Sequence, residues 1–307
     1  MADDAEIVVV GAGPAGMTAG LYGARSGHRT LVLERALPGG QAALTAEVEN
    51  YPGFAEPVSG TSLTQAMQMQ AERFGCTFAN ADVFGLDRTD SGFVLNLDSG
   101  PVTARAVIIA TGVKPKPLGI PGEKELTGRG VSYCAVCDGP LFRNQEVAVV
   151  GGGDSAMDEA LYLAGFCSRV YLIHRRDEFR GARTAEERLR RHPKVTLILS
   201  SIVTSVSGTT HVENIEVKAL KDDSTRRLPV AGLFIYVGSI PNTDWCAPLV
   251  KLDENGFVVT DALLETSSPG VFAAGDVRVT PLRQICTAVA DGALAAMSAH
   301  RFLTEQS

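Results

Sequence analysis

The 307-residue chain has few cysteines, few aromatic residues and no long apolar run. Its six cysteines are too sparse for the disulfide framework of a small secreted scaffold. The longest apolar candidate, residues 285–303, is interrupted by Asp291, His300 and Arg301, whereas a membrane helix needs about 18 uninterrupted apolar residues. Lys and Arg number 28 against 35 Asp and Glu, and this net charge of −7 disfavours nucleic-acid binding.

The remaining composition is that of a globular protein. Apolar residues make up 45% of the chain and charged residues 21%, which excludes disordered and fibrous classes. The length predicts about two domains. The 32 glycines suggest backbone packed closely around ligands. The acidic segment Met1–Glu6 leads directly into an expected strand, so we predict neither a signal peptide nor a transit peptide, and a cytoplasmic protein.

The chain contains an internal repeat. Residues 6–35 and 146–175 align without a gap at an offset of 140 residues. Each copy begins with a β-branched run, continues through a glycine cluster into a stretch of helical period, and closes with a second apolar run. This order predicts a β-turn-α-β unit in each copy, and therefore an α/β fold with parallel sheets.

Both glycine clusters fit the G-x-G-x-x-G/A pattern of dinucleotide-binding loops. They are Gly11–Gly16 and Gly151–Ala156. In this pattern the first glycine permits a tight turn, the second lets the backbone approach a pyrophosphate at the helix N-terminus, and the third position packs helix on strand. The pattern alone is weak evidence, but here the strand, helix and second strand all follow in order.

The residue after each second strand separates the two ligands. Glu34 stands 23 residues past Gly11, where a carboxylate accepts a hydrogen bond from a free ribose 2′-hydroxyl. The equivalent position in the second copy is His174, which is followed by Arg175, Arg176 and Arg180. Cations there suit a 2′-phosphate. The first site is therefore expected to bind FAD or NAD, and the second NADP.

Two proline-bearing segments bracket the second copy. Pro115, Pro117 and Pro121 lie before it, and residues 239–243 follow it. We therefore predict that one domain is inserted into the other. The expected boundaries are residues 1–113 and 243–307 for the first domain and residues 114–242 for the inserted one.

A pair of cysteines, Cys134 and Cys137, precedes the second glycine cluster. The C-x-x-C spacing suits a reversible disulfide, and Asp138 directly after it is a candidate proton donor or acceptor. A zinc site is an alternative, but there is no second C-x-x-C and no histidine within 35 residues, so we expect no metal. The pair could also be structural. The other four cysteines, including Cys286, are expected to pack in the core.

A flavin-type site, an NADP-type site and a C-x-x-C pair together suggest a pyridine-nucleotide–disulfide oxidoreductase, since hydride and a disulfide each involve two electrons. Across nearly its whole length the chain resembles the low-molecular-weight thioredoxin reductases of bacteria. The motifs that carry the resemblance are Gly11–Gly16 with Glu34, residues 38–41, residues 49–53, residues 110–112, Cys134–Asp138, Gly151–Ala156, residues 174–177 with Arg180, residues 274–277, and Arg283 with Gln284.

The resemblance implies two Rossmann-like, three-layer ββα domains, with the NADPH domain inserted into the FAD domain, in a homodimeric flavoprotein. Electrons would pass from NADPH to FAD, to the Cys134–Cys137 disulfide and then to thioredoxin. Cys137 would face the flavin, Cys134 would attack the partner, and Asp138 would be the acid–base group. Rotation of the inserted domain about its two linkers would bring nicotinamide and disulfide to the flavin in turn.

The resemblance also implies the binding residues. Those expected at FAD are Gly11, Gly13, Ala15, Gly16, Glu34, Arg35, Gly40, Gln41, Asn50, Val83, Ala110, Thr111, Gly112, Gly275, Asp276, Arg283, Gln284 and Ile285. Those expected at NADPH are Gly151, Gly153, Asp154, Ser155, Ala156, His174, Arg175, Arg176 and Arg180.

The chain departs from the family near its cysteines. Many relatives carry two aromatic residues after the equivalent of Gly139 that help to dock thioredoxin, whereas this chain has Pro140, Leu141 and then Phe142. The partner could therefore be another thioredoxin-like or peroxiredoxin-linked protein. Arg129 matches a family position that contacts thioredoxin. A ferredoxin-driven relative, a ferredoxin–NADP reductase and a non-catalytic flavoprotein are further alternatives, but the basic run and the cysteine pair disfavour them.

Overall fold

The computed structural model describes residues 5–45 and 48–305, so residues 1–4, on which the leader prediction rests, lie outside the described part. The chain divides into two compact units, with breaks between Lys114 and Pro115 and between Ser239 and Ile240. We call residues 1–114 with 240–307 the first unit, and residues 115–239 the inserted unit. No helix in the described part is long and apolar enough to cross a membrane.

The first unit is built on a sheet whose strands follow the order β3-β2-β1-β6-β5-β4, with β17 also paired to β6. The strands are β1 (Ala5–Val10), β2 (Thr30–Glu34), β3 (Thr77–Asn80), β4 (Val83–Thr89), β5 (Gly92–Leu97), β6 (Val102–Ile109) and β17 (Val271–Ala273). One edge of strand β6 pairs with β1. The other edge is divided between two strands: its first residues pair antiparallel with β5, and its last residues pair parallel with β17.

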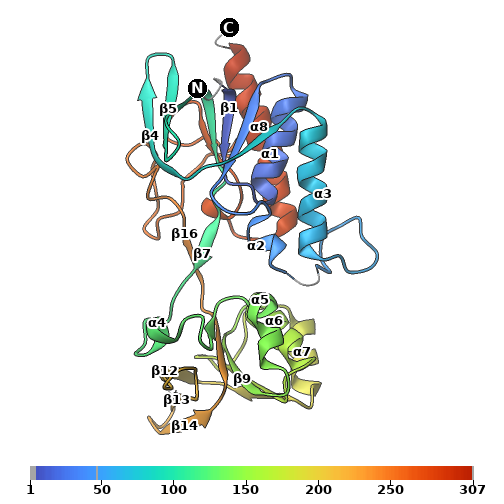
Figure 1. The fold of residues 1–307 in the computed structure, drawn as a ribbon, viewed down its shortest axis with the longest axis vertical. Helices are drawn as coiled ribbons and strands as arrows, with labels where there is room; N and C mark the ends of the chain where they lie inside the picture. Colours follow the sequence, from blue (N-terminus) through green and yellow to red (C-terminus); the bar gives the residue numbers. More distant parts are fainter. Residues whose placement is uncertain (1–4, 46–47, 306–307) are drawn as a thin grey trace. The chain divides into compact units, whose positions relative to one another are not determined.

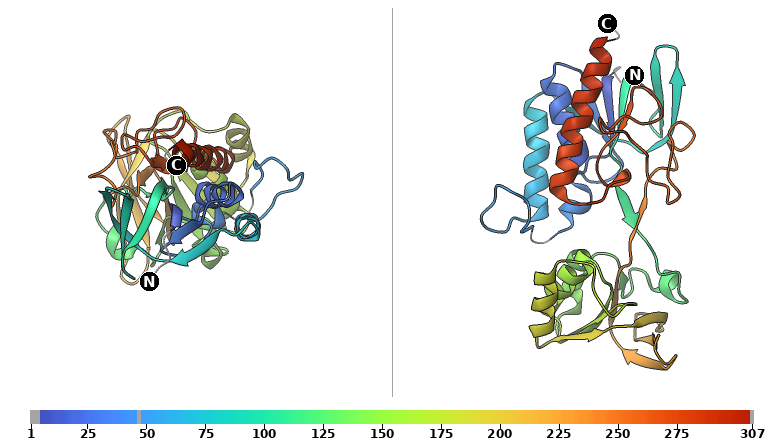
Figure 2. Two further views of the ribbon diagram at one scale, coloured as in Figure 1. Left: turned by 90° about the horizontal axis from the view of Figure 1, so that it is seen from above. Right: turned by 180° about the vertical axis from the view of Figure 1, so that it is seen from behind.

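Helices cover one face of this sheet (Figures 1 and 2). They are α1 (Pro14–Arg25), the short α2 (Gly40–Ala43), α3 (Gly60–Arg73) and α8 (Ile285–Glu305). Side chains of β1 alternate between the faces: Ile7 and Val9 join the core under the helices, while Val8 and Val10 join a second core with β4, β5 and residues 245–258. Both faces of β1 are buried, which explains its continuous apolar sequence.

The inserted unit has the same plan. Its sheet runs in the order β11-β10-β9-β15-β8, and all of these pairings are parallel. The strands are β8 (Val131–Ser132), β9 (Glu146–Gly151), β10 (Arg169–Ile173), β11 (Val195–Ile198) and β15 (Gly232–Tyr236). The helices are α4 (Glu123–Leu126), α5 (Ala135–Asp138), the 3₁₀ turn η1 (Gly139–Phe142), α6 (Asp154–Ala164) and α7 (Arg183–Arg191).

A small antiparallel sheet of β12 (Ser201–Ser207), β13 (Asn214–Ala219) and β14 (Thr225–Pro229) covers the other face. Val149 and Phe234 pack beneath α6 and α7, whereas Val150 and Ile235 pack beneath the small sheet. Each unit is thus a three-layer ββα structure, which confirms the predicted fold class. The two connecting segments, β7 (Val113–Pro115) and β16 (Ser239–Pro241), pair with each other.

Candidate functional site

The first glycine loop joins β1 to α1 and is shaped by close backbone contacts. Gly11 has a φ of +106°, and a Cβ at this position would collide with the carbonyl oxygen of Ala110. Gly13 is the N-cap of α1, and no heavy atom lies within 4 Å of the position that its Cβ would occupy. The loop therefore leaves open space at the positive N-terminus of a helix, where phosphate oxygens bind well.

Glu34, at the end of β2, is fixed beside this loop. Its Oε2 accepts a 2.8 Å hydrogen bond from the Ala12 amide, and its Oε1 accepts a 3.0 Å hydrogen bond from the Ala36 amide. Glu34 lines a cavity of about 90 Å³ together with other residues predicted at FAD, and with residues that were not predicted. The other predicted ones are Gly11, Arg35, Val83 and Thr111, and those not predicted include Asn242 and Trp245. Asn242 and Thr111 exchange two side-chain hydrogen bonds, of 2.7 and 2.9 Å, so these two strand ends hold each other in place.

The turn after β17 carries the third predicted FAD segment. Burial raises the pKa of Asp276, while the nearby Arg283 guanidinium opposes this shift. Arg283 lies over the ring of Phe257 at 4.2 Å and donates to the backbone oxygen of Asp276. Asn50 donates a 3.0 Å hydrogen bond to the side chain of Gln284, so the segment predicted around residue 50 does meet the start of α8. Gln41 reaches the backbone oxygen of Val113 at 3.5 Å.

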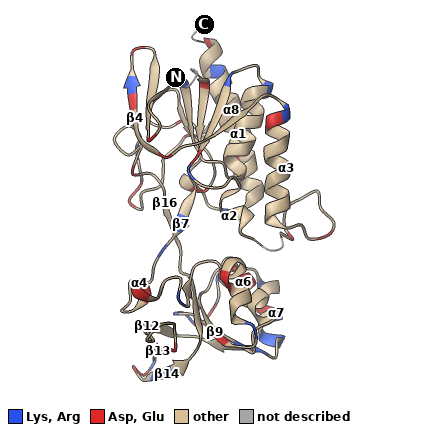
Figure 3. Cartoon of the chain, viewed as in Figure 1, with Lys and Arg blue, Asp and Glu red and all other residues tan. Residues whose placement is uncertain are grey.

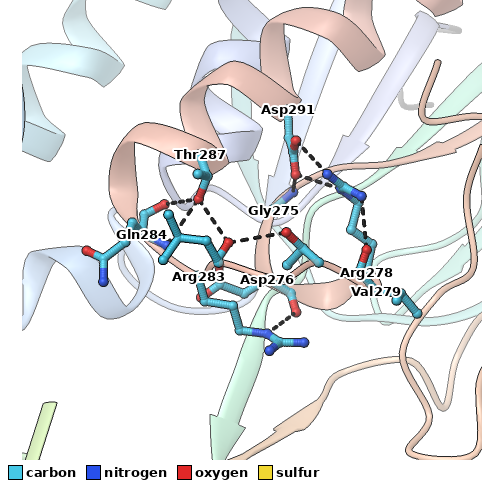
Figure 4. A network of polar contacts seen from close by, with 10 residues as sticks. Gly275, Asp276, Arg278, Val279, Arg283, Gln284, Thr287 and Asp291 are labelled. Atoms are coloured by element: carbon cyan, nitrogen blue, oxygen red, sulfur yellow. Dashed lines mark hydrogen bonds and ion pairs between the residues drawn. The ribbon is translucent and has the colours of Figure 1, made fainter. Parts of the chain in front are cut away.

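Asp291, which sequence reasoning missed, holds this turn to α8 (Figure 4). Its Oδ2 accepts hydrogen bonds from the amide of Gly275 at 3.0 Å and from Nε of Arg278 at 2.7 Å, and its Oδ1 accepts from Nη2 of Arg278 at 2.9 Å. Both side chains are mostly buried, so this bidentate pair is a rigid support for Asp276. The signal for Asp291 in the sequence is a single acidic residue within the mainly apolar segment 285–303, and by itself it argues only against a membrane helix.

The second glycine loop joins β9 to α6 and is tied to the basic segment. Gly153 is the N-cap of α6, and again no heavy atom lies near its missing Cβ. The amide of Arg180 donates a 2.8 Å hydrogen bond to the carbonyl oxygen of Gly152, and Oδ1 of Asp154 accepts a 2.6 Å hydrogen bond from the amide of Ala182. The predicted phosphate-binding loop and the predicted arginine segment therefore belong to one local structure.

His174 is the buried centre of this structure. It is 6% exposed, stacks on Phe179 with ring centroids 5.5 Å apart, and lies so close to Gly152 that a Cβ there would overlap its ring. Burial, together with the charge of Arg180, lowers its pKa, so the ring is neutral near pH 7. Its Nε2 has no hydrogen-bond partner within the described part of the chain.

Arg175, Arg176 and Arg180 are exposed. None of the three guanidinium groups has an ion-pair partner among residues 5–45 and 48–305, and Figure 3 shows further basic residues gathered around α7. Unpaired cations beside a helix N-terminus suit a phosphate group.

Both units fit the groups that their motifs imply. In the first unit, open space at a helix N-terminus adjoins a fixed carboxylate that can accept from ribose hydroxyls, which suits FAD. In the inserted unit, the unpaired nitrogen of His174 needs a partner from outside the described chain, and the free guanidinium groups of Arg175, Arg176 and Arg180 suit a 2′-phosphate, as in NADPH.

Cys134 and Cys137 form a disulfide with a Cα–Cα distance of 5.4 Å, at the start of α5. Cys134 is the N-cap of this helix, and its Sγ accepts a 3.2 Å hydrogen bond from the Cys137 amide. Cys137 is exposed, while Cys134 and Asp138 are half-buried. The amide of Asp138 donates to the carbonyl oxygen of Cys134, so all three predicted catalytic residues belong to one turn of helix.

Glu123, also missed from the sequence, organises the chain on the approach to the disulfide. Its buried carboxylate accepts from the amides of residues 118, 119 and 120 and from the hydroxyl of Tyr133, at 2.6–3.2 Å. Burial favours the neutral carboxyl, but these four hydrogen bonds outweigh it and lower the pKa of Glu123. Tyr133 is the residue before Cys134, so the connection from the linker to the disulfide is held by one carboxylate.

The four free cysteines differ in their exposure. Cys76, Cys167 and Cys246 are buried, as expected, but Cys286 is only half-buried. Burial raises the pKa of the Cys76 and Cys246 thiols to about 12, so both stay protonated near pH 7. No cluster of three or more metal-ligating side chains occurs among the residues that the structure describes. Phe142 packs edge-on against Phe234, whereas Leu141, on the short turn that follows α5, is 73% exposed.

The chain matches the family model of pyridine nucleotide-disulphide oxidoreductases over residues 5–292, and it belongs to this family. Within it, the chain is 43% identical over 303 residues to a thioredoxin reductase of Treponema pallidum (strain Nichols), which covers 99% of this chain and 98% of that protein.

Two solved thioredoxin reductases are similar to the whole chain. The crystal structure of the Lactococcus lactis enzyme in its FR conformation has a TM-score of 0.96 at 42% identity, and the match covers 98% of this chain and 100% of that one. The enzyme of Streptococcus pyogenes MGAS5005 has a TM-score of 0.66 at 41% identity, with 98% of each chain covered.

Proposed function

We propose that this protein is an NADPH-dependent flavoprotein that reduces the disulfide of thioredoxin. The first unit binds FAD, and the inserted unit binds NADPH and carries the redox disulfide. When bound, NADPH supplies a two-electron hydride and FAD passes the electron pair on to sulfur. The observation that carries the proposal is the Cys134–Cys137 disulfide, which lies in the same unit as a glycine loop of the dinucleotide-binding pattern and a run of exposed arginines.

The chain's own residues handle sulfur and protons. Reduction breaks the Cys134–Cys137 bond and takes up two electrons and two protons. The resulting dithiol then passes the two electrons and two protons to the disulfide of the partner, and the Cys134–Cys137 bond forms again. Asp138 is the proposed proton carrier because it lies one residue after Cys137. The assignment of Cys134 as the attacking thiol rests on the family resemblance, since Cys137 is the more exposed sulfur.

We further propose that the inserted unit rotates between two orientations, so that nicotinamide and disulfide reach the flavin in turn. Two solved relatives with nearly equal identity and coverage score 0.96 and 0.66. Divergence within either unit does not explain this difference, but a displacement of whole units between those relatives would. The paired segments Val113–Pro115 and Ser239–Pro241 are the proposed hinges.

The proposed assembly is a homodimer in the cytoplasm. Leu294 and Met297 on α8 are 39% and 43% exposed and follow each other at helical spacing, which supports a protein contact on this face. Light scattering of the purified protein measures the assembly directly: a mass of two chains is expected, and a single-chain mass overturns it. The free, buried thiols are consistent with a reducing compartment.

Turnover assays test the function. NADPH oxidation with a disulfide dye should be slow alone and fast when thioredoxin is added, and NADH should be a poor substitute. Rapid dye reduction without thioredoxin would contradict the mechanism. A different thioredoxin-like partner is the second candidate, because Leu141 is exposed where many relatives present aromatic residues. Comparing turnover with several thioredoxin-fold proteins at equal concentration distinguishes the two.

A further inference from the structure

A side-chain hydrogen bond attaches the redox helix α5 to β15, in the central sheet of the inserted unit. The amide of Ala135, the first residue of α5, donates a 2.8 Å hydrogen bond to the hydroxyl of Tyr236. Ala135 is completely buried, so this amide cannot turn to solvent. A buried backbone amide without a partner costs about 1–3 kcal/mol, and the hydroxyl therefore stabilises this start of the helix.

Tyr236 is held rigidly at its own position. It is the last residue of β15, and it pairs with Gly151 of the neighbouring β9. A Cβ on Gly151 would touch the backbone of Tyr236, so the two strand ends are in close contact. Burial, with the charges of Glu159 and Asp138, raises the pKa of Tyr236. The hydroxyl therefore stays neutral and can accept the Ala135 hydrogen bond over the physiological pH range.

Two neighbouring amides at this helix start have local partners. The Cys134 amide donates to Oγ of Ser132, and the Cys137 amide donates to Sγ of Cys134. The Ala135 amide, in contrast, ties the disulfide turn to β15, 101 positions further along the chain. After reduction, Cys134 carries a thiol or thiolate with new acceptor capacity at the helix N-terminus, and the two sulfur atoms no longer hold the turn in the geometry that places the Ala135 amide at Tyr236.

We propose that Tyr236 is a positioning residue for the redox disulfide, and that its hydroxyl stabilises the disulfide form relative to the dithiol form. This role rests on the proposed function of Cys134 and Cys137. Its consequence is a lower reduction potential for the pair, which sets how readily electrons pass on to the partner's disulfide. Replacement of Tyr236 by Phe removes the hydroxyl and keeps the ring.

The test compares the reduction potentials of wild type, Tyr236→Phe and Tyr171→Phe in the flavin-loaded protein. Each is equilibrated without oxygen in buffers of reduced and oxidised dithiothreitol, which supply the two electrons and two protons. Free thiols are then alkylated, and the mass of the tryptic peptide of residues 130–143, whose only cysteines are Cys134 and Cys137, is measured by mass spectrometry. Tyr171→Phe is the matched control, since the Tyr171 hydroxyl, on β10 of the same sheet, donates to Glu146 instead of binding α5.

Tyr236→Phe should be half-reduced at an about tenfold lower ratio of reduced to oxidised dithiothreitol, which corresponds to about +30 mV. Tyr171→Phe should stay within about twofold of wild type. An unchanged midpoint in Tyr236→Phe, or an equal shift in Tyr171→Phe, overturns the proposal.

A second variant tests whether the shift comes from the Tyr236–Ala135 hydrogen bond or from a general loss of packing around Tyr236. Ala135→Pro removes the amide donor at the first helical position, where proline is tolerated. In this background Tyr236→Phe should cause no further shift, and an undiminished shift contradicts the proposed hydrogen bond. Because dithiothreitol replaces NADPH, these results do not depend on whether the protein reduces thioredoxin, which the turnover assay tests separately.

Discussion

Oε2 of Glu34 lies 2.8 Å from the amide nitrogen of Ala12, in the middle of the first glycine loop. One carboxylate thus joins the end of β2 to the turn that follows β1. It lines the same cavity as Gly11 and Thr111, so the residue expected to bind a ribose also shapes the phosphate-binding backbone.

Glu34→Gln should therefore lose flavin. The amide side chain is a weaker acceptor for both the Ala12 amide and ribose hydroxyls, and a lost hydrogen bond to a charged group costs about 1.5–3 kcal/mol. We expect an about tenfold to hundredfold weaker FAD affinity, measured by flavin absorbance after dialysis and by titration of the apoprotein.

The matched control is Glu6→Gln. Glu6 also accepts a hydrogen bond from a backbone amide of the first unit, that of Arg29 at 3.0 Å, but it does not line the cavity of Glu34. Flavin retention equal to wild type is expected for it. Equal flavin loss in both variants would mean that Glu34 acts only through stability.

Arg176→Leu should weaken NADPH selectively. The exposed guanidinium of Arg176 has no ion-pair partner in the described part of the chain and is predicted to bind the 2′-phosphate. Loss of this charge-assisted contact should raise KM for NADPH about tenfold or more, with kcat little changed and KM for NADH unchanged. Steady-state kinetics with both nucleotides measures this.

Arg191→Leu, at the exposed end of α7, is the control for net charge. It should leave both KM values near wild type. A parallel rise in KM for NADPH and NADH in Arg176→Leu would remove the 2′-phosphate assignment.

Glu159 on α6 predicts a pH-dependent stability. Burial, with the charge of Asp158, raises its pKa to about 7 from the usual 4.5. The folded state therefore binds this proton more tightly than the unfolded chain, so the stabilisation is complete below about pH 4.5 and is lost as the pH rises through about 7.

In Glu159→Gln the side chain at position 159 is uncharged at every pH, so the variant does not lose this stability as the pH rises. Relative to wild type, its free energy of unfolding should increase by about 2 kcal/mol between pH 5 and pH 8, with little further change above that. Urea unfolding across this range measures the difference. Glu187→Gln, which removes an exposed carboxylate on α7, should follow wild type, and a flat difference for Glu159→Gln contradicts the shift.

Local motifs made much of the architecture predictable. Gly11, Gly13, Gly151 and Gly153 were identified because a strand, a turn and a helix must follow one another within a short stretch of chain. The repeat then gave the parallel order around β1 and β9, and the cysteine spacing gave the pair that the structure links.

The supports of these motifs were not predictable, because they join residues far apart in the chain. Tyr236 bonds to Ala135 across 101 positions, and Asp291 bonds to Gly275 across 16. Glu123 and Tyr133 are only ten positions apart, but a glutamate ten residues before a tyrosine is not a recognisable sequence motif. Only the folded chain brings such pairs together.

The central claim is that electrons from NADPH reach thioredoxin through the Cys134–Cys137 disulfide. The most direct measurement is the rate of NADPH oxidation with oxidised thioredoxin for the flavin-loaded variants Cys134→Ser and Cys137→Ser, with Cys167→Ala, a buried free cysteine of the same unit, as control. Both serine variants should keep their flavin, still show its reduction by NADPH, and lose thioredoxin turnover, while Cys167→Ala turns over like wild type. Sustained thioredoxin reduction by either serine variant would contradict the account.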